Sequence, residues 1–278
     1  MCRGRSAGTF DLWYMKTQTA LVTGANKSIG LEVVRQLAGA GYHVFLGSRD
    51  REKGEAAVRQ LTDGRELTEG GGLTAGGGLA EGGGLAERGR IELLIVDVSS
   101  ESSVKAAAAD LAQRIPRLDV LVNNAGILGR LPQTPSDAGD DNMHQVFETN
   151  FFGAVRMVRH FMPLLEKSEL PRIVNVTSDL ASLTLHNDPQ WRYYAIKGAA
   201  YGPSKTALNA YTVALAYELR DRGFKVNAVN PGHTATEFNN FRGYKKVGDA
   251  AAIVAQYAQL DKDGPSGRFI SDYGESPW

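Results

Sequence analysis

Short, almost wholly apolar segments alternate along this chain with longer segments in which apolar residues recur every three or four positions. The short segments are rich in Val, Ile and Leu and end near Gly, Asn, Asp or Ser, a pattern typical of buried strands. The longer segments have the period of amphipathic helices. The pattern predicts strands at 19–23, 42–46, 91–97, 119–123, 172–177, 225–230 and around Phe269, and helices at 28–40, 51–62, 102–114, 142–166, 201–221 and 247–260.

Strands that lack polar alternation and are separated by helices indicate a parallel sheet covered on both faces. The expected fold class is therefore α/β: a single-domain, Rossmann-type, doubly wound parallel sheet of about seven strands with helices on both faces. No linker divides residues 16–278, which we assign to one domain. Residues 1–15 precede the first strand and are expected to form a disordered N-terminal extension.

Residues 67–90 consist of a glycine-rich hexapeptide repeat, with three copies and a degenerate fourth. Hexapeptide repeats can form β-helices, but triple glycine offers no side chains with which to pack a core. Gly-rich segments behave as flexible chains, and a surface loop can be lengthened at small entropic cost. We therefore expect a flexible loop insertion between the second helix and the third strand, with no function of its own.

The composition is that of an ordinary globular protein, with 42% apolar and 22% charged residues. Lys and Arg together number 31, as do Asp and Glu, so the net charge of zero favours neither a nucleic-acid nor a membrane partner. No apolar run reaches the ~20 residues of a membrane span, and the start lacks the apolar core of a secretory signal. Cys2 is the only cysteine, and no histidine pair has metal-ligand spacing. We expect a reducing, cytoplasmic location and no metal.

The turn between the first strand and the first helix reads Thr-Gly-Ala-Asn-Lys-Ser-Ile-Gly over residues 23–30. At such a turn, backbone N–H groups and the helix dipole attract a pyrophosphate. Gly24 permits a tight turn, and Gly30 lets the helix pack closely against the sheet. We expect this turn to bind a dinucleotide through Gly24, Asn26, Lys27, Ser28, Ile29 and Gly30.

The end of the second strand discriminates between the two nicotinamide cofactors. An acidic residue there binds the free ribose 2′-hydroxyl of NAD, whereas an arginine accommodates the 2′-phosphate of NADP. This strand ends in Ser48-Arg49 with no preceding carboxylate, and Lys27 supplies a second cation. The sequence therefore predicts NADP, the alternative being that Arg49 only pairs with a neighbouring carboxylate. Further cofactor contacts are expected after the third and fourth strands, from Asp97 and Val98 to the adenine and from Asn124, Ala125 and Gly126 to a flat ring.

Two tyrosine–lysine pairs with a spacing of four occur late in the chain, Tyr193/Lys197 and Tyr201/Lys205. On a helix this spacing places both side chains on one face, where an ammonium lowers the pKa of the phenol and suits it to proton transfer. An apolar stripe of helical period follows Tyr201 without interruption, whereas Gly198 follows Lys197 and disfavours a helix there. We therefore prefer Tyr201/Lys205.

Five motifs now stand in a fixed order: TGANKSIG at 23–30, NNAG at 123–126, VNVTS at 174–178, YGPSK at 201–205 and PGHTAT at 231–236. Together they resemble the classical short-chain dehydrogenase/reductase family over about residues 16–271. The resemblance is greatest to its NADPH-dependent, carbonyl reductase-like branch.

The resemblance implies a role for each matching residue. Tyr201 is expected to donate the proton in reduction and accept it in oxidation, while Lys205 lowers its pKa and holds the nicotinamide ribose. Ser178 is expected to hydrogen-bond the substrate oxygen, and Asn150 to hold a water linked to Lys205. The motif after the sixth strand is expected to position the nicotinamide carboxamide through Pro231, Gly232, Thr234 and Thr236.

Two departures from the family pattern stand out. Ser28 occupies a position that is glycine in the family, so its Cβ narrows the approach to a pyrophosphate. Ser178 and Tyr201 are 23 positions apart, more than the family pattern implies, and Tyr193 fits the usual spacing better. Choosing Tyr201 implies an insertion across 183–200, whose aromatic residues either roof an apolar pocket or pack on one another. The insertion borders helix faces that many family tetramers bury, so a monomer and a homo-oligomer both remain open.

The function expected from these residues is hydride transfer from NADPH to an aldehyde or ketone, with an apolar or aromatic substrate. The same residues run in reverse would make an alcohol dehydrogenase. A non-catalytic NADP-binding scaffold or regulatory protein is the third alternative, since a fold does not fix a function. The complete set Asn150, Ser178, Tyr201 and Lys205 favours an enzyme.

Overall fold

A computed structural model describes residues 17–63 and 89–278. The expected N-terminal extension at 1–15 and nearly all of the glycine-rich insertion at 67–90 lie outside the described residues. Every strand and helix expected from the hydrophobic pattern lies within the described part of the chain.

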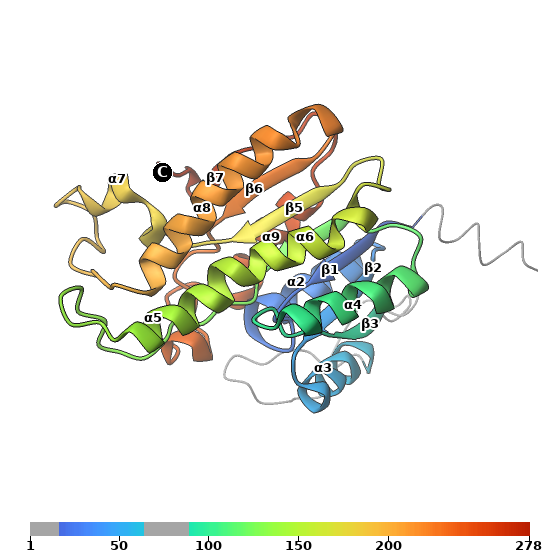
Figure 1. The fold of residues 1–278 in the computed structure, drawn as a ribbon, viewed down its shortest axis with the longest axis horizontal. Coiled ribbons are helices and arrows are strands. Elements are labelled where there is room, and N and C mark those ends of the chain that lie inside the picture. Colours follow the sequence, from blue (N-terminus) through green and yellow to red (C-terminus); the bar gives the residue numbers. More distant parts are fainter. Residues whose placement is uncertain (1–16, 64–88) are drawn as a thin grey trace, which may run out of the picture.

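The strands form one eight-stranded sheet in the order β3-β2-β1-β4-β5-β6-β7-β8 (Figure 1). Neighbouring strands from β3 to β7 are parallel, and only β8 is antiparallel to its neighbour. The predicted doubly wound parallel fold is thus confirmed. Only the two-residue β8 was not expected, because it is too short to have a pattern of its own. The strands are β1 (Thr19–Val22), β2 (His43–Ser48), β3 (Arg90–Ile95), β4 (Val120–Asn123), β5 (Arg172–Val176), β6 (Lys225–Val229), β7 (Phe269–Ser271) and β8 (Gly274–Glu275).

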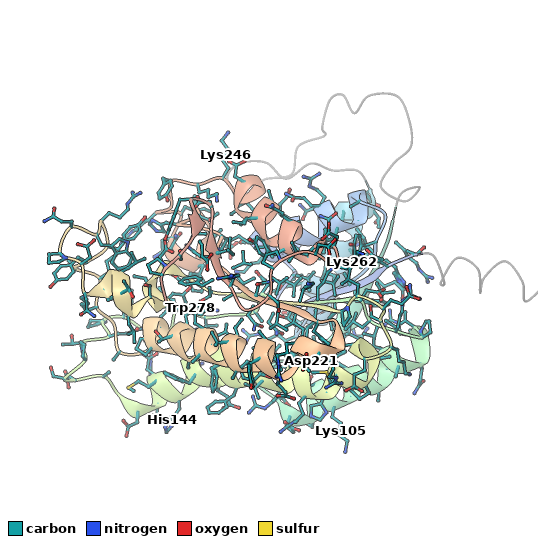
Figure 2. All side chains as sticks on the ribbon, turned by 90° about the horizontal axis from the view of Figure 1, so that it is seen from above. Lys105, His144, Asp221, Lys246, Lys262 and Trp278 are labelled. Atoms are coloured by element: carbon teal, nitrogen blue, oxygen red, sulfur yellow. The ribbon has the colours of Figure 1, made fainter. Side chains whose placement is uncertain are left out.

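Helices cover both faces of the sheet, as its continuously apolar strands require. Helices α2 (Ser28–Gly39), α3 (Arg51–Thr62) and α9 (Val247–Ala258) pack on one face, and α4 (Glu101–Arg114), α6 (Gly153–Leu165) and α8 (Tyr201–Glu218) pack on the other. Figure 1 looks onto the second layer, and Figure 2 shows the sheet between the two. Each layer encloses its own apolar core. No helix among residues 17–63 and 89–278 is long and apolar enough to cross a membrane.

The helix expected at 142–166 is interrupted. It consists of α5 (Asp140–Phe147), a π-helical turn at Glu148–Phe152 and α6. The hydrophobic period predicts one uninterrupted helix at 142–166 and does not reveal the phase shift of about 100° that one extra residue introduces. π-Turns are rare and frequent at functional sites, and this one contains Asn150.

The helix expected at 201–221 ends at Glu218, followed by a 3₁₀ turn at Arg220–Arg222 and by Gly223 with a φ of 75°. A left-handed glycine is a common helix stop. Three shorter elements, namely a 3₁₀ turn at Asp179–Ala181, α7 (Leu183–His186) and a 3₁₀ turn at Glu237–Asn239, lie in the loops after β5 and β6.

The carboxyl ends of β1, β4, β5 and β6 lie at one edge of the sheet, because all four strands are parallel neighbours. The chain leaves β1 toward β2 and leaves β4 toward β5, so the strand order reverses between them. Ligands of open α/β sheets bind at such a switch point. All five sequence motifs start at this edge or pack against it.

Candidate active site

Side-chain to backbone hydrogen bonds join the turn after β1 to the Asn-Asn-Ala-Gly loop at the end of β4. The Thr23 hydroxyl accepts hydrogen bonds from the backbone nitrogens of Asn124 and Ala125, both at 3.0 Å. Gly24 has a φ of +60°, and a Cβ there would lie 2.8 Å from the Ala125 Cα. A Cβ on Gly30 would lie 2.5 Å from Asn124 Nδ2. The two glycines are therefore required by close packing. Thr23 was not singled out from the sequence, although its place at the end of β1, before Gly24, is a usable signal.

The first turn of α2 presents backbone N–H groups at this edge. Lys27, in the N-cap position, has an extended backbone with a φ of −164° and makes no side-chain cap. The first N–H groups of a helix lack intrahelical partners, so this end favours an anion. Ile29 instead packs against the apolar core beneath. An uncapped helix start beside a glycine cradle fits the pyrophosphate of a dinucleotide.

Ser28 adopts a left-handed backbone conformation with a φ of 53°. This conformation brings the Cβ of an L-residue close to its own carbonyl and is routine only for glycine. The family's glycine at this position is thus explained, and the serine is strained rather than merely larger. Its Cβ lies on the turn that is expected to hold the cofactor.

The three residues expected to select NADP each have a different environment in the structure. Lys27 is paired with Glu237, which belongs to the 3₁₀ turn after β6. Arg49 is exposed. The Ser48 side chain is 1% exposed and its hydroxyl donates to Asp50 O at 2.7 Å, so it serves a turn. The two cations, rather than the serine, are available to a 2′-phosphate once Lys27 leaves Glu237.

Two further expected cofactor residues follow β3. Asp97 Oδ1 accepts hydrogen bonds from the backbone nitrogen of Ser99 at 3.0 Å and from its hydroxyl at 2.7 Å. Val98 is 7% exposed and packs against Gly153, where a Cβ would lie 2.9 Å from Val98 Cγ2. These hydrogen bonds therefore hold the Asp97 carboxylate in a fixed orientation just after β3, at the edge of the sheet where the strands end.

The loop after β6 is folded onto itself. Gly232 has a φ of 84°, and its N–H donates to Asn230 Oδ1 at 3.0 Å. The Thr234 hydroxyl donates to Gly232 O at 3.0 Å, and the Thr236 side chain caps the 3₁₀ turn that carries Glu237. Pro231 is buried. This loop and the turn after β1 are joined by the Lys27–Glu237 pair.

Tyr201 and Ser178 meet, although 23 positions separate them. The Ser178 side chain lies beside the Tyr201 phenol and lowers its pKa, against the larger effect of burial. Lys205 lies one turn further along α8 and is 3% exposed, and its ammonium donates to Val176 O at 2.8 Å. A Cβ on Gly126 would lie 3.5 Å from Lys205 Nζ and 3.4 Å from Asn150 Oδ1. Ser178, Tyr201, Lys205, Gly126 and Asn150 therefore form one cluster.

The Asn150 side chain is committed to holding the backbone. Its Oδ1 accepts from Ile127 N at 2.8 Å, and its Nδ2 donates to Ile127 O at 2.9 Å and to the Ser204 hydroxyl at 3.0 Å. Ser204 in turn donates to Tyr201 O at 2.6 Å. Both hydrogens of the Asn150 amide are used in these hydrogen bonds. Its side chain therefore holds the backbone at Ile127 and the Ser204 hydroxyl in place beside Lys205.

Tyr193 lies in a turn and Lys197 in the irregular segment that follows it, so neither is on a helix. A spacing of four aligns two side chains only on a helix. Lys197 Nζ hydrogen-bonds His186 O at 2.7 Å and His186 Nδ1 at 3.0 Å, and it lies over the Tyr194 ring at 4.3 Å. This pair thus lacks the geometry that the Tyr201/Lys205 pair has.

Aromatic residues of the 183–200 segment pack both on one another and on the loop after β6. Trp191 contacts Tyr193 with ring centroids 5.5 Å apart, and Tyr193 contacts His233 at 5.8 Å. Phe238, from the same loop as His233, lies 5.4 Å from the Tyr201 ring. The interpretation that these aromatic residues pack on one another is met by the Trp191–Tyr193 contact, and a pocket beneath them stays a prediction.

Burial opposes ionisation of both groups of the proton-transfer pair. It raises the pKa of Tyr201 to about 12, against the hydrogen bond with Ser178, and it lowers the pKa of Lys205 to about 8. Burial outweighs every opposing influence on the Tyr201 pKa here, and the expectation that Lys205 lowers this pKa stays a prediction. The physical reason is desolvation, which disfavours the charged form of each group.

Replacing Ser28 by glycine should stabilise the protein. The left-handed conformation destabilises the folded state by about 1–2 kcal/mol when the residue is not glycine. Glycine removes that strain, but its greater conformational freedom in the unfolded chain offsets about 0.5–1 kcal/mol of the gain. We expect Ser28→Gly to raise the free energy of unfolding by about 0.5–1 kcal/mol, measured by urea denaturation. Ser28→Ala retains the Cβ and is the matched control; an equal gain with alanine would contradict the strain argument.

The buried Lys205 should make stability depend on pH. Its pKa of about 8 lies below its ordinary 10.5, so between these values the unfolded chain binds a proton that the folded protein does not. Stability attributable to Lys205 therefore rises with pH across this window. At about 1.4 kcal/mol per pKa unit, the rise is about 3 kcal/mol.

Urea denaturation of wild type and Lys205→Met at several pH values between 8 and 10.5 checks this. We expect the difference in unfolding free energy between the two proteins to shift in favour of wild type as pH rises. A difference that stays constant with pH would show that Lys205 keeps its ordinary pKa.

Comparison with known proteins agrees with this arrangement. A family model of short chain dehydrogenases matches residues 18–69 and 82–246. Among curated proteins, (+)-neomenthol dehydrogenase of Capsicum annuum is 28% identical over 321 residues, covering 91% of this chain and 95% of the relative.

Two solved structures are also similar. Salutaridine reductase from Papaver somniferum has a TM-score of 0.71 at 27% identity, over 92% of this chain and 99% of the other. A metagenomic short-chain oxidoreductase in complex with NADP has a TM-score of 0.67 at 28% identity, over 91% and 94%. The sequence motifs, the doubly wound sheet and the family match agree: this chain belongs to the short-chain dehydrogenase family and is an oxidoreductase of carbonyl or alcohol substrates.

Proposed function

We propose that the protein reduces an aldehyde or ketone with NADPH and that Tyr201 delivers the proton. The contact between the Ser178 and Tyr201 hydroxyls, with the buried Lys205 ammonium one helical turn away, carries this proposal. Two hydroxyls that converge can both hydrogen-bond one carbonyl oxygen, and donors aimed at the oxygen stabilise the charge that develops there. NADPH, when bound, supplies the hydride.

Each residue of the cluster has a part in this reaction. Ser178 orients the substrate oxygen, and Tyr201 protonates it as the alcohol forms. The high pKa of Tyr201 keeps the phenol protonated at neutral pH, which is the form that a proton donor requires. Lys205 holds the nicotinamide ribose and, while charged, stabilises the phenolate that proton donation leaves. The reverse reaction, alcohol oxidation, needs the phenolate, which burial disfavours in the cofactor-free protein.

NADP is favoured over NAD by the charges beside the glycine turn. Lys27 and Arg49 are the residues that would meet a 2′-phosphate, and no acidic residue ends β2. The turn would hold the pyrophosphate through Gly24, Asn26, Ser28 and Gly30, and the loop after β6 would meet the carboxamide through Pro231, Gly232, Thr234 and Thr236. Binding of NADP by a metagenomic short-chain oxidoreductase of similar structure supports this assignment.

An apolar, ring-bearing substrate suits the side chains beside Tyr201. Phe238 packs against the Tyr201 ring, and its side chain remains 41% exposed. Tyr193 and His233 extend the aromatic surface from the two flanking loops. Exposed aromatic faces next to a proton donor favour substrates whose own rings can be buried against them.

Tyr201→Phe should abolish carbonyl reduction, because phenylalanine has no proton to give. We expect kcat to fall by at least about 100-fold, the usual contribution of a positioned acid. Turnover of a panel of aromatic and aliphatic ketones, followed by NADPH absorbance, measures this. Tyr193→Phe is the matched control and should retain turnover; loss of activity in Tyr193→Phe alone would overturn the assignment of the proton donor.

Removing either cation should weaken the binding of NADPH and leave that of NADH unchanged. A charge-assisted hydrogen bond contributes about 1.5–3 kcal/mol, so Lys27→Ala or Arg49→Ala should raise the Kd of NADPH about tenfold or more. Glu237→Gln removes the competing partner of Lys27. Because an exposed ion pair is worth at most about 1 kcal/mol, NADPH should bind up to about fivefold more tightly.

Cofactor fluorescence titration of the purified variants measures these dissociation constants. Equal Kd values for NADPH and NADH in wild type, unaffected by Arg49→Ala, would refute the preference for NADP. NADPH binding unchanged in Glu237→Gln would refute only the competition for Lys27.

A further inference from the structure

Tyr201 is the first residue of α8, and no side chain at the start of α8 caps the N–H groups of its first turn. Ala200 is in the N-cap position and has no side chain that could accept a hydrogen bond. The first N–H groups of a helix must find partners outside the helix, and Pro203 removes one of them because it has none. The N–H groups of Ala200 and Tyr201 remain to be satisfied.

Gln133, from the loop between β4 and α5, supplies the missing partner. Its Oε1 accepts hydrogen bonds from the backbone nitrogens of Ala200 at 3.3 Å and Tyr201 at 3.2 Å. Its backbone carbonyl accepts a third from Ala199 at 3.0 Å. A Cβ on Gly198 would lie 3.0 Å from the same Oε1, so the chain is glycine where it passes this amide. The last three residues before the helix and its first residue, Tyr201, converge on Gln133.

The other end of the Gln133 amide is fixed to the loop that follows the Asn-Asn-Ala-Gly motif. Its Nε2 donates to Leu128 O at 2.7 Å, and the side chain is 6% exposed. Gln133 therefore joins the cofactor-facing loop after β4 directly to the first residue of the catalytic helix. Figure 1 shows this loop, which leads into α5, beside the start of α8.

Gln133 does not move freely, because two other buried amides hold the same loop. Asn150 bonds both the N–H and the carbonyl of Ile127, at 2.8 and 2.9 Å. Asn142 does the same for Arg130, at 2.8 and 3.0 Å. The amides of Asn150 and Asn142 lie on the continuous α5–α6 segment and are 1% and 7% exposed. The loop is thus a rigid base for Gln133.

We propose that Gln133 is the positioning residue that fixes the register of α8, so that Tyr201 rather than Tyr193 lies against Ser178. The 183–200 segment separates Ser178 from α8 and contains Tyr193, so position along the chain alone does not specify which tyrosine reaches Ser178. Gly202 sets the opposite side of the helix start, since a Cβ there would lie 2.9 Å from Leu180 O. Gln133 and Leu180 hold the first turn between them.

The proposal rests on the proposed function, and its test separates the two. Gln133→Leu keeps the size of the side chain and removes both hydrogen-bonding groups. Gln133→Glu keeps the oxygen that caps Ala200 and Tyr201 and loses the donor to Leu128. Asn227→Leu is the matched control, because Asn227 is 1% exposed and bridges Pro265 O and Arg268 N at the far end of the sheet.

The first measurement is amide hydrogen exchange of Ala200 and Tyr201, whose N–H groups bond the Gln133 side chain, and it needs no substrate. We expect Gln133→Leu to speed their exchange at least tenfold, while Gln133→Glu and Asn227→Leu preserve the protection of wild type. Thermal unfolding is recorded for every variant, and all comparisons are made below the unfolding range. Unchanged exchange in Gln133→Leu would overturn the capping role.

The second measurement is ketone reduction, with the Kd of NADPH determined in parallel. Because an error of about 1 Å in a reacting group can cost about 100-fold, kcat of Gln133→Leu should fall at least tenfold. The Kd of NADPH should stay within twofold, and Gln133→Glu should lose less kcat than Gln133→Leu. Faster exchange with unchanged kcat, or an equal loss of kcat in Asn227→Leu, would overturn the positioning role. Inactive wild type would refute the proposed function and leave the exchange result intact.

Discussion

Hydrogen bonds from buried side-chain amides hold the catalytic segments to one another, and the rest of the site depends on them. The segments after β1, β4 and β5 are loops, so their backbones cannot pair in ladders as strands do. Asn123 Nδ2 donates to Asn175 Oδ1 at 2.8 Å across the sheet, and Asn175 Nδ2 donates to the Thr212 hydroxyl of α8 at 2.9 Å. The same chemistry recurs at Asn150 and Gln133. Asn175, Asn150 and Gln133 each use both the donor and the acceptor of the amide and so fix a distance, whereas Asn123 uses only its donor.

This rigidity explains how the site tolerates groups that burial disfavours. Lys205 is nearly inaccessible, and its ammonium has Val176 O as a hydrogen-bond partner. Without a scaffold of satisfied amides, water would enter and the pKa values of Tyr201 and Lys205 would return toward their ordinary values. Their displacement to about 12 and about 8 is therefore a consequence of the packing around them. Perturbed groups of this kind cluster at functional sites.

The turn expected to bind the cofactor is held by less favourable interactions than the cluster around Tyr201 and Lys205. Ser28 holds a strained backbone, and Lys27 is paired with an exposed carboxylate across the edge of the sheet. The Lys27–Glu237 pair would have to break before Lys27 could meet an anion at this turn. The catalytic cluster, by contrast, is satisfied internally, because Asn150, Ser204 and Tyr201 form a continuous chain of hydrogen bonds.

The fold and the position of the site could be read from the sequence, because both follow from local patterns. Hydrophobic period gave the strands and helices to within a few residues, and parallel pairing brings their carboxyl ends to one edge. The interruption of the helix at Glu148–Phe152 was missed because a five-residue turn is too short to establish a period of its own, and β8 was missed because it has only two residues. The left-handed backbone of Ser28 was also missed, since serine carries no signal for that conformation.

The sequence by itself determined that two tyrosine–lysine pairs were present and that a long helix follows only Tyr201. The sequence also determined that β2 is followed by the cation Arg49 and that no carboxylate precedes it there. Only the tertiary structure decided that Tyr201 meets Ser178, that Lys27 is held by Glu237 and that Gln133 caps the catalytic helix. These three contacts join residues far apart in the chain, and a pattern along the sequence contains no information about distance between its ends. Burial, which sets the pKa values of Tyr201 and Lys205, likewise exists only once the layers have packed.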